Sequence, residues 1–152
     1  MFLLEKINGD LKQAMREKNK ELVSVLRMLV SAIRNREIAL RQGDKTELAD
    51  EQTAEVIAGE IKKRKDSAAI YEQGGRQDLA EKEKWETATL EKYLPPQLSE
   101  EEIEKTVAEV IKSMGGAAAD FGKAMGQAMA KLKGKADGTK VGEIVKKVLS
   151  NN

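Results

Sequence analysis

Apolar residues recur three or four positions apart along most of this chain, with charged residues between them. This period is that of an amphipathic helix, whereas a half-buried strand alternates at every second residue. The third apolar stripe begins near Asp50, which we expect to cap the helix, and stops at the Gly74-Gly75 pair. Four helices are predicted from stripes at 4–15, 22–33 and 54–71 and from a weaker pattern at 77–93.

Pro95 and Pro96 mark the clearest boundary in the chain. Proline fixes its own φ angle and biases the preceding residue toward extended backbone, so we expect no helix to pass through this pair. Directly afterwards, Ser99 and Glu102 have the spacing of a capping box, which starts a new helix. Apolar stripes then predict one helix up to Gly115 and two more at about 120–132 and 139–149.

The pattern therefore predicts an all-α protein in two parts. A first helical domain, with four helices that include a long-helix hairpin, is expected over residues 1–94. A small three-helix domain is expected over residues 98–150. Composition agrees, because aromatic residues are only 3% of the chain and any core must consist of aliphatic side chains and methionine.

Composition also removes several kinds of chemistry. The chain has no cysteine, which excludes disulfides, thiolate metal sites and a cysteine nucleophile. It has no histidine, the commonest proton shuttle near neutral pH and the commonest zinc ligand. The carboxylates scatter over helix faces without a nucleophile–base pair. We therefore expect no metal, no cofactor and no catalytic residue, although an enzymatic role stays open.

The location is predicted from the absence of long apolar runs. No stretch of about 18 apolar residues exists, so no membrane segment is expected. The run Met1-Phe-Leu-Leu4 is too short for a secretory signal, and charge follows it at once. These features predict a cytoplasmic protein.

Charge is unevenly distributed behind a net charge of +1. Residues 121–152 carry seven lysines against two carboxylates, a net charge of +5, whereas residues 98–120 carry two lysines against six carboxylates, a net charge of −4. Ammonium groups and the backbone N–H groups of a helix start both bind phosphate. The candidate nucleic-acid-binding residues are Lys131, Lys133, Gly134, Lys135, Gly138, Thr139 and Lys140. A solvated loop without a ligand is the alternative.

Small residues and methionines alternate on the helix that precedes this loop. Gly122 and Gly126 cost helix stability, about 1 kcal/mol each relative to alanine, which indicates that another group comes close to them. A neighbouring helix is the favoured group, and an RNA backbone is the alternative. Met125 and Met129 are expected to pack inward.

A second polar cluster surrounds the Gly74-Gly75 corner. It consists of Arg64, Asp66, Ser67, Arg76 and Asp78. The cluster could form a charged groove, but we favour a network of ion pairs and caps that fixes the corner between two helices.

Several short motifs in combination resemble the YqeY family over essentially the whole chain. They are Leu26-Arg-Met-Leu29, Arg64-Lys-Asp-Ser67, Gly75-Arg-Gln-Asp-Leu79, Leu90-Glu-Lys-Tyr-Leu-Pro-Pro-Gln-Leu98, Met125-Gly-Gln-Ala-Met129 and Lys133-Gly-Lys-Ala-Asp-Gly138. The resemblance implies a helical N-terminal part followed by a small helical tail domain.

The family is in turn similar to the C-terminal tail of the B subunit of glutamyl/aspartyl-tRNA amidotransferase, a helical tail that contacts tRNA. For this chain the resemblance implies a tRNA-binding-like module at residues 125–140, with tRNA or another structured RNA as partner. It does not imply an amidotransferase active site, because a carbon–nitrogen ligase activity with glutamine as amide donor belongs to the larger protein. An adaptor that docks on an amidotransferase or a synthetase is the alternative.

Overall fold

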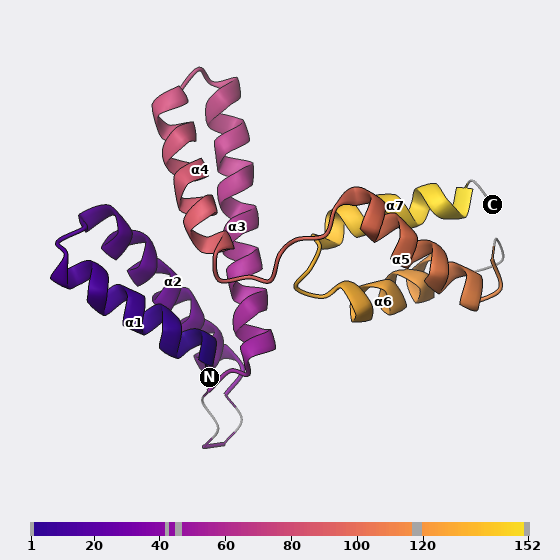
Figure 1. The fold of residues 1–152 in the computed structure, drawn as a ribbon, viewed down its shortest axis with the longest axis horizontal. Coiled ribbons are helices and arrows are strands. Elements are labelled where there is room, and N and C mark those ends of the chain that lie inside the picture. The colour runs from indigo at the N-terminus through magenta and orange to yellow at the C-terminus, as the bar shows by residue number, and fades with distance from the viewer. Residues whose placement is uncertain (1, 42, 45–46, 117–119, 151–152) are drawn as a thin grey trace. The chain divides into compact units, whose positions relative to one another are not determined.

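The chain folds into α-helices throughout the part that the structure describes. The computed structural model describes residues 2–41, 43–44, 47–116 and 120–150, which contain seven helices and no strand, so the all-α prediction is confirmed (Figure 1). Contacts divide the chain into two compact units, Met1–Leu94 and Pro95–Asn152. The helices are α1 (Phe2–Arg16), α2 (Lys20–Ala39), α3 (Asp50–Gln73), α4 (Gln77–Glu91), α5 (Glu100–Ser113), α6 (Phe121–Leu132) and α7 (Gly138–Ser150).

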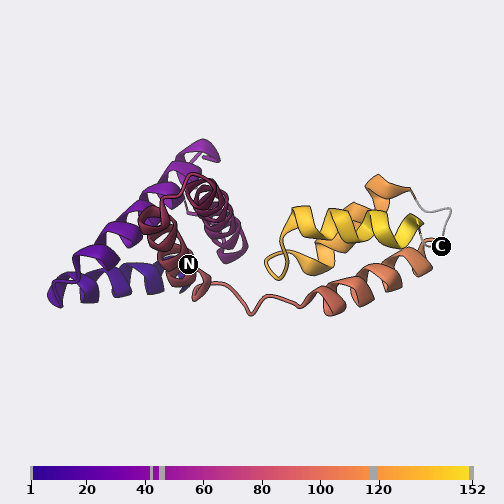
Figure 2. The ribbon, with the colours of Figure 1, turned by 90° about the horizontal axis from the view of Figure 1, so that it is seen from above.

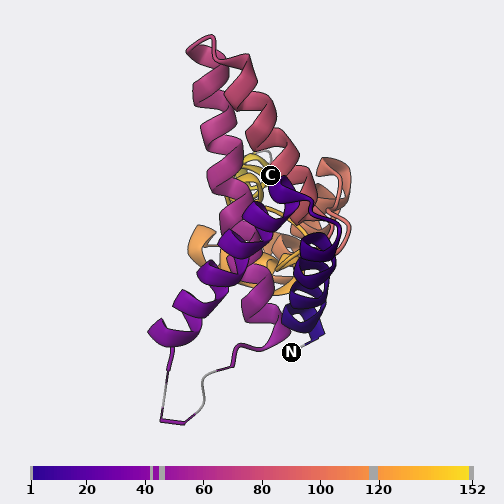
Figure 3. The ribbon, with the colours of Figure 1, turned by 90° about the vertical axis from the view of Figure 1, so that its left-hand side faces the viewer.

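The first unit consists of two helix hairpins that share one aliphatic core. Helix α1 packs on α2 and α3, and α3 packs on α2 and α4. The α3–α4 hairpin extends beyond the α1–α2 pair, as the views in Figure 1 and Figure 3 both show. The core contains the stripe residues that the sequence pattern singles out, since burial of aliphatic surface is the main stabilising term. Its buried members are Ile7, Val25, Leu26, Leu29, Ile33, Leu48, Ile57, Ile61 and Leu90.

The start of α3 differs from the prediction. The N-cap position belongs to Ala49, whose backbone N–H donates to Oε1 of Gln52 at 3.0 Å. Asp50 is the first residue of the helix, and its Oδ1 accepts from the backbone N–H of Leu3 at 3.3 Å. The expectation that Asp50 caps its own helix is therefore wrong, because its carboxylate ties α3 to the start of α1 instead.

Tyr93 anchors the end of the first unit. Its hydroxyl donates to Oδ2 of Asp10 on α1 at 2.5 Å, and the ammonium of Lys6 lies 5.7 Å from the centre of its ring. Burial of the phenol and its bond to the Asp10 carboxylate both raise the pKa of Tyr93. The last turn after α4 is thereby attached to α1.

The second unit is a three-helix bundle in which each helix packs on the other two (Figure 2). Its buried core is aliphatic and consists of Ile103, Val107, Ile111, Ala124, Ala128, Leu132, Val141, Ile144 and Val145. Two helices of this unit have side-chain caps, and the one at Ser99 is the capping box predicted from the sequence. The Ser99 hydroxyl accepts from the Glu102 N–H at 3.2 Å, while the Glu102 carboxylate accepts from the Ser99 N–H at 2.8 Å. Asp120 accepts from the Lys123 N–H at 3.2 Å.

None of the described helices is both long enough and apolar enough to cross a lipid bilayer.

The capping box at the start of α5 gives a first test. Replacing Ser99 by Ala leaves the N–H of Glu102 without its acceptor, so we expect the free energy of unfolding to fall by about 1 kcal/mol. Thermal and chemical unfolding followed by circular dichroism measure this change. Ser113→Ala, at the other end of α5, is the control, because the Ser113 hydroxyl only donates to the Val110 carbonyl. An equal effect of both variants would contradict a role of Ser99 as cap.

Candidate nucleic-acid interface

The loop between α6 and α7 is held by backbone hydrogen bonds. Gly134 has a φ of +78°, a conformation that favours glycine, and turns the chain away from α6. The carbonyl of Lys135 accepts from the Leu98 N–H at 2.9 Å, and that of Gly134 accepts from the Gln97 side chain at 3.1 Å. The loop is therefore fixed to the segment that leads into α5. The side chains of Lys131, Lys133 and Lys135 are exposed.

The start of α7 already holds a carboxylate. The backbone carbonyl of Asp137 accepts from the Val141 N–H at 3.0 Å, and its Oδ1 accepts from the Thr139 N–H at 3.4 Å. A carboxylate at a helix N-terminus occupies the position that a bound phosphate would take. Gly138 is half-buried, and a Cβ built on it would lie 3.8 Å from the Met129 methyl group. Gly138 therefore serves the packing of α6 on α7.

Lys140 has a different electrostatic environment from Lys131, Lys133 and Lys135. It lines a depression of about 460 Å³ together with Glu100, Asp137, Glu143 and Lys147. The three carboxylates outnumber the two ammonium groups there, so the depression does not attract an anion. Of the seven predicted residues, the structure leaves Lys131, Lys133, Gly134 and Lys135 on a basic surface and places Gly138, Thr139 and Lys140 beside acidic side chains.

The outward side of α6 continues this basic surface. Between Phe121 and Ala136 the chain has four lysines and no carboxylate. Besides the buried Ala124 and Ala128, α6 has exposed residues that form what we call the α6 face: Lys123, Gly126, Gln127, Ala130 and Lys131. The sequence analysis missed Lys123, although its spacing of eight residues from Lys131 places both on one side of a helix.

The glycines of α6 do not have the neighbour that the sequence analysis favoured. Gly126 is exposed, and no atom of the described residues lies within 4 Å of a Cβ built there. The expectation of a helix packed against it within the described chain is therefore wrong. The inward packing of the methionines is confirmed, since Met125 and Met129 are half-buried and pack against the core of the second unit. A Cβ built on Gly142 or Gly138 of α7 would lie 3.7 or 3.8 Å from their methyl groups.

The second polar cluster separates into two groups. Arg64 is buried between α3 and α4, where its Nη1 donates to Glu60 Oε2 at 2.8 Å and its Nε lies 3.3 Å from Glu86 Oε2. Arg76 is exposed at the hairpin tip and forms two hydrogen bonds to the Asp78 carboxylate, at 3.2 and 3.1 Å.

Neither group leaves an open binding site at the corner. Hydrogen bonds from Arg76 lower the pKa of Asp78, whose carboxylate is therefore ionised at neutral pH. Asp66 is exposed and Ser67 is half-buried on α3, and among the described residues neither forms a hydrogen bond with Arg64 or Arg76. Beyond Arg64 and Glu86, the pairs Lys65–Glu91 and Lys84–Glu72 also join α3 to α4.

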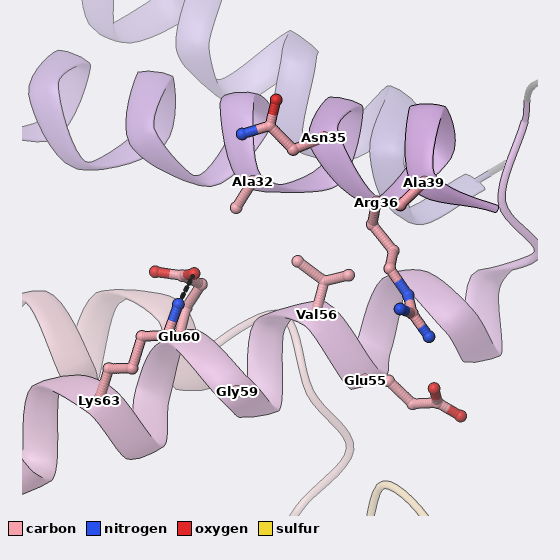
Figure 4. A pocket seen from close by; sticks show the side chains of 9 residues that line it. All are labelled: Ala32, Asn35, Arg36, Ala39, Glu55, Val56, Gly59, Glu60 and Lys63. Atoms are coloured by element: carbon pink, nitrogen blue, oxygen red, sulfur yellow. Dashed lines mark hydrogen bonds and ion pairs between the residues drawn. The ribbon is translucent and has the colours of Figure 1, made fainter. Parts of the chain in front are cut away.

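A groove between α2 and α3 carries charges of both signs (Figure 4). Its volume is about 520 Å³, and Ala32, Ala39 and Gly59 form part of its small-residue wall. Arg36 extends from α2 into the groove, on the side where Glu55 lies, while Lys63 bonds Glu60 at 3.3 Å. Mixed charge does not select a polyanion. Among the described residues, no group of acidic side chains could hold a metal ion.

Glu60 gives a test of the buried ion pairs. Its burial acts to raise its pKa, but hydrogen bonds from Arg64 and Lys63 outweigh this effect, and the pKa lies below its ordinary value. A lowered folded-state pKa stabilises the fold above the unfolded-state pKa, and this contribution disappears as the pH falls through the folded-state value.

We therefore expect Glu60→Gln to lower the free energy of unfolding by about 1–2 kcal/mol at neutral pH. Between about pH 5 and pH 3 the variant should lose less stability than the wild type. Urea unfolding across this pH range measures both effects. Exposed Glu81, changed to Gln, is the matched control. A pH dependence that is the same in all three proteins would refute the role of the Glu60 carboxylate.

Comparison with known proteins gives one family. Residues 4–149 match the family model described as Yqey-like protein. The chain is 34% identical over 111 residues to "Altered inheritance of mitochondria protein 41, mitochondrial" of Saccharomyces cerevisiae, a match that covers 71% of this chain and 58% of that protein. The protein of the same name in Clavispora lusitaniae is 34% identical over 74% of this chain and 64% of its own length. That of Pyrenophora tritici-repentis is 29% identical over 88% and 73%.

The chain thus spans about three fifths of the length of the first two of these relatives. The names of these three relatives describe them as mitochondrial. The cytoplasmic location expected from the sequence is contradicted by these relatives. The reason for the error is that the absence of a long apolar run says nothing about which compartment holds the protein.

Proposed function

This chain belongs to the YqeY-like family, and from this premise we propose that it is a non-catalytic module that binds tRNA or another structured RNA. The binding surface consists of the α6 face and the lysines that follow it, Lys133 and Lys135. The start of α7 and Lys140 do not belong to this surface, because carboxylates lie beside both.

The observation that carries the proposal is the acid-free stretch from Phe121 to Ala136. Every other described helix has at least one carboxylate, so a helix that has lysines alone departs from the rest of the chain. Exposed Gly126 and Ala130 leave the backbone of α6 open to close approach. Ammonium groups around small residues suit a phosphodiester backbone, which needs positive charge and room.

The low aromatic content of the chain limits how it can recognise RNA. Aromatic residues are 3% of the sequence, too few for a platform on which single-stranded bases stack. A partner is therefore held by its shape and its phosphates, as structured RNA is. The same open face of α6 also suits a partner helix, so an adaptor for an amidotransferase or a synthetase is the second candidate function.

Removal of two lysines tests the proposal. Lys131→Gln with Lys135→Gln should weaken binding of a labelled tRNA transcript and lower the magnitude of the log–log salt slope by roughly 2. Fluorescence anisotropy at several salt concentrations measures both. The control variant, Lys105→Gln with Lys112→Gln, removes equal charge from exposed positions on α5 of the same unit. Equal affinity and slope for the two double variants would reject the surface.

A second test uses the open glycine. Gly126→Gln should raise the free energy of unfolding by about 0.5 kcal/mol, because glutamine forms helices better than glycine and its side chain enters open space. The same side chain should weaken tRNA binding, since it stands where the phosphate backbone approaches.

The matched control for that test is Gly9→Gln on α1, another exposed helical glycine with nothing within 4 Å. It should stabilise equally without any effect on RNA. A Gly126→Gln protein that binds tRNA as tightly as the Gly9→Gln protein would show that RNA does not contact α6.

A further inference from the structure

Helix α2 exposes a row of cations on the side opposite its core. Lys20, Arg27 and Arg34 recur at intervals of seven residues, which places them on one side of α2 over about 20 Å, and Arg41 continues the spacing two residues after the helix ends at Ala39. Ser24 and Ser31 stand between them. All six side chains are exposed, and we call this row the α2 face.

The α2 face differs from the ordinary solvated surfaces of the same unit. Exposed lysines on α3 and α4 have acidic neighbours, as in the pairs Lys63–Glu60, Lys65–Glu91 and Lys84–Glu72. The two carboxylates of α2 do not lie on the row. Glu37 is buried, and Glu21, one residue after Lys20, is turned about 100° around the helix axis.

Within the part of the chain that the structure describes, few hydrogen-bond acceptors or carboxylates lie beside the cations of the α2 face. Lys20 and Arg27 have no ion-pair partner among the residues that the structure describes. Arg41 uses its Nε to donate to the Gly43 carbonyl at 3.2 Å, and the rest of its guanidinium has no partner among the described residues. Arg34 lies 3.5 Å from the Glu37 carboxylate, which orients its side chain.

The prevalence of arginine on this helix also favours phosphate as the ligand. Four of the seven arginines of the chain lie between positions 27 and 41, and the second unit has none. The guanidinium group matches two phosphate oxygens at once, whereas an ammonium acts as a point charge. Arg36, the remaining arginine of this helix, extends into the groove beside Glu55 and is not part of the row (Figure 4).

We propose that the α2 face is a second RNA-binding surface, which holds the phosphate backbone through Arg27, Arg34 and Arg41 while Ser24 and Ser31 donate hydroxyl hydrogen bonds. An anionic membrane fits the row less well. A membrane-binding helix presents a continuous apolar side for insertion, whereas here serines stand between the cations and the exposed large apolar residues of α2 are Met28 and Ile38. The partner class is the one proposed for α6, but the surface belongs to the other unit.

The test removes charge from the α2 face without disturbing buried groups. The variant is Lys20→Gln, Arg27→Gln and Arg41→Gln, which keeps Arg34 because its loss would leave the buried Glu37 carboxylate without a cation. The control is Lys12→Gln, Lys82→Gln and Lys92→Gln, which removes three exposed lysines from the same unit. Full-length proteins are titrated with a labelled tRNA transcript at 50–200 mM salt and, separately, with phosphatidylglycerol vesicles.

We expect the α2 variant to bind tRNA roughly tenfold more weakly than the control and to lower the magnitude of the salt slope by roughly 2–3. An α2 variant that matches the control in affinity and slope would overturn the inference, as would a loss confined to the vesicles. If only the α6 double variant loses tRNA binding, the proposed function stands and this inference fails. If only the α2 variant loses it, the inference stands and the α6 surface fails.

Discussion

Burial of aliphatic side chains in two separate cores is the constraint on which the rest of this structure depends. With so few aromatic residues, neither unit can gain much from any single side chain, and each core is built from many leucines, isoleucines, valines and alanines. Leu94 ends one compact unit and Pro95 begins the other, at the point where the proline pair interrupts helical backbone. Because the cores take up the apolar residues, the chemistry of this chain lies on its surface.

The surface then differs from helix to helix in how its charges are arranged. On α3 and α4, lysines and glutamates pair across the hairpin, and the buried Arg64 lies between two glutamates. Such ion pairs join the two helices. Because the opposite charges lie close together, the electrostatic potential around them is small. Helices α2 and α6 instead present cations on their outward sides with few carboxylates beside them, the pair Arg34–Glu37 being one on α2. A row of cations with net positive charge attracts polyanions over a distance comparable with the Debye length, about 10 Å at moderate salt.

Glycine and aspartate show how far residue types alone can mislead. Gly126 stands in a stretch of small residues that suggests a close helix contact, yet a Cβ built there meets only open space. A Cβ built on Gly138 or Gly142 would instead touch Met129 or Met125. In the sequence, Asp50 and Asp120 each stand at the expected start of a helix. Asp120 caps its own helix, whereas Asp50 accepts from Leu3 on another helix. Local sequence does not distinguish these cases, because the choice depends on which distant backbone arrives beside the side chain.

The order of apolar and polar residues was enough to predict seven helices, the capping box at Ser99 and the inward methionines, since each depends on residues within one or two helical turns. The sequence also identified four candidate lysines near the carboxyl end, Lys131, Lys133, Lys135 and Lys140. The packing of α5 and α7 then separated Lys140, among carboxylates, from Lys131, Lys133 and Lys135. Electrostatic environment depends on charges that are distant in sequence and near in space, so it emerged when the helices came together.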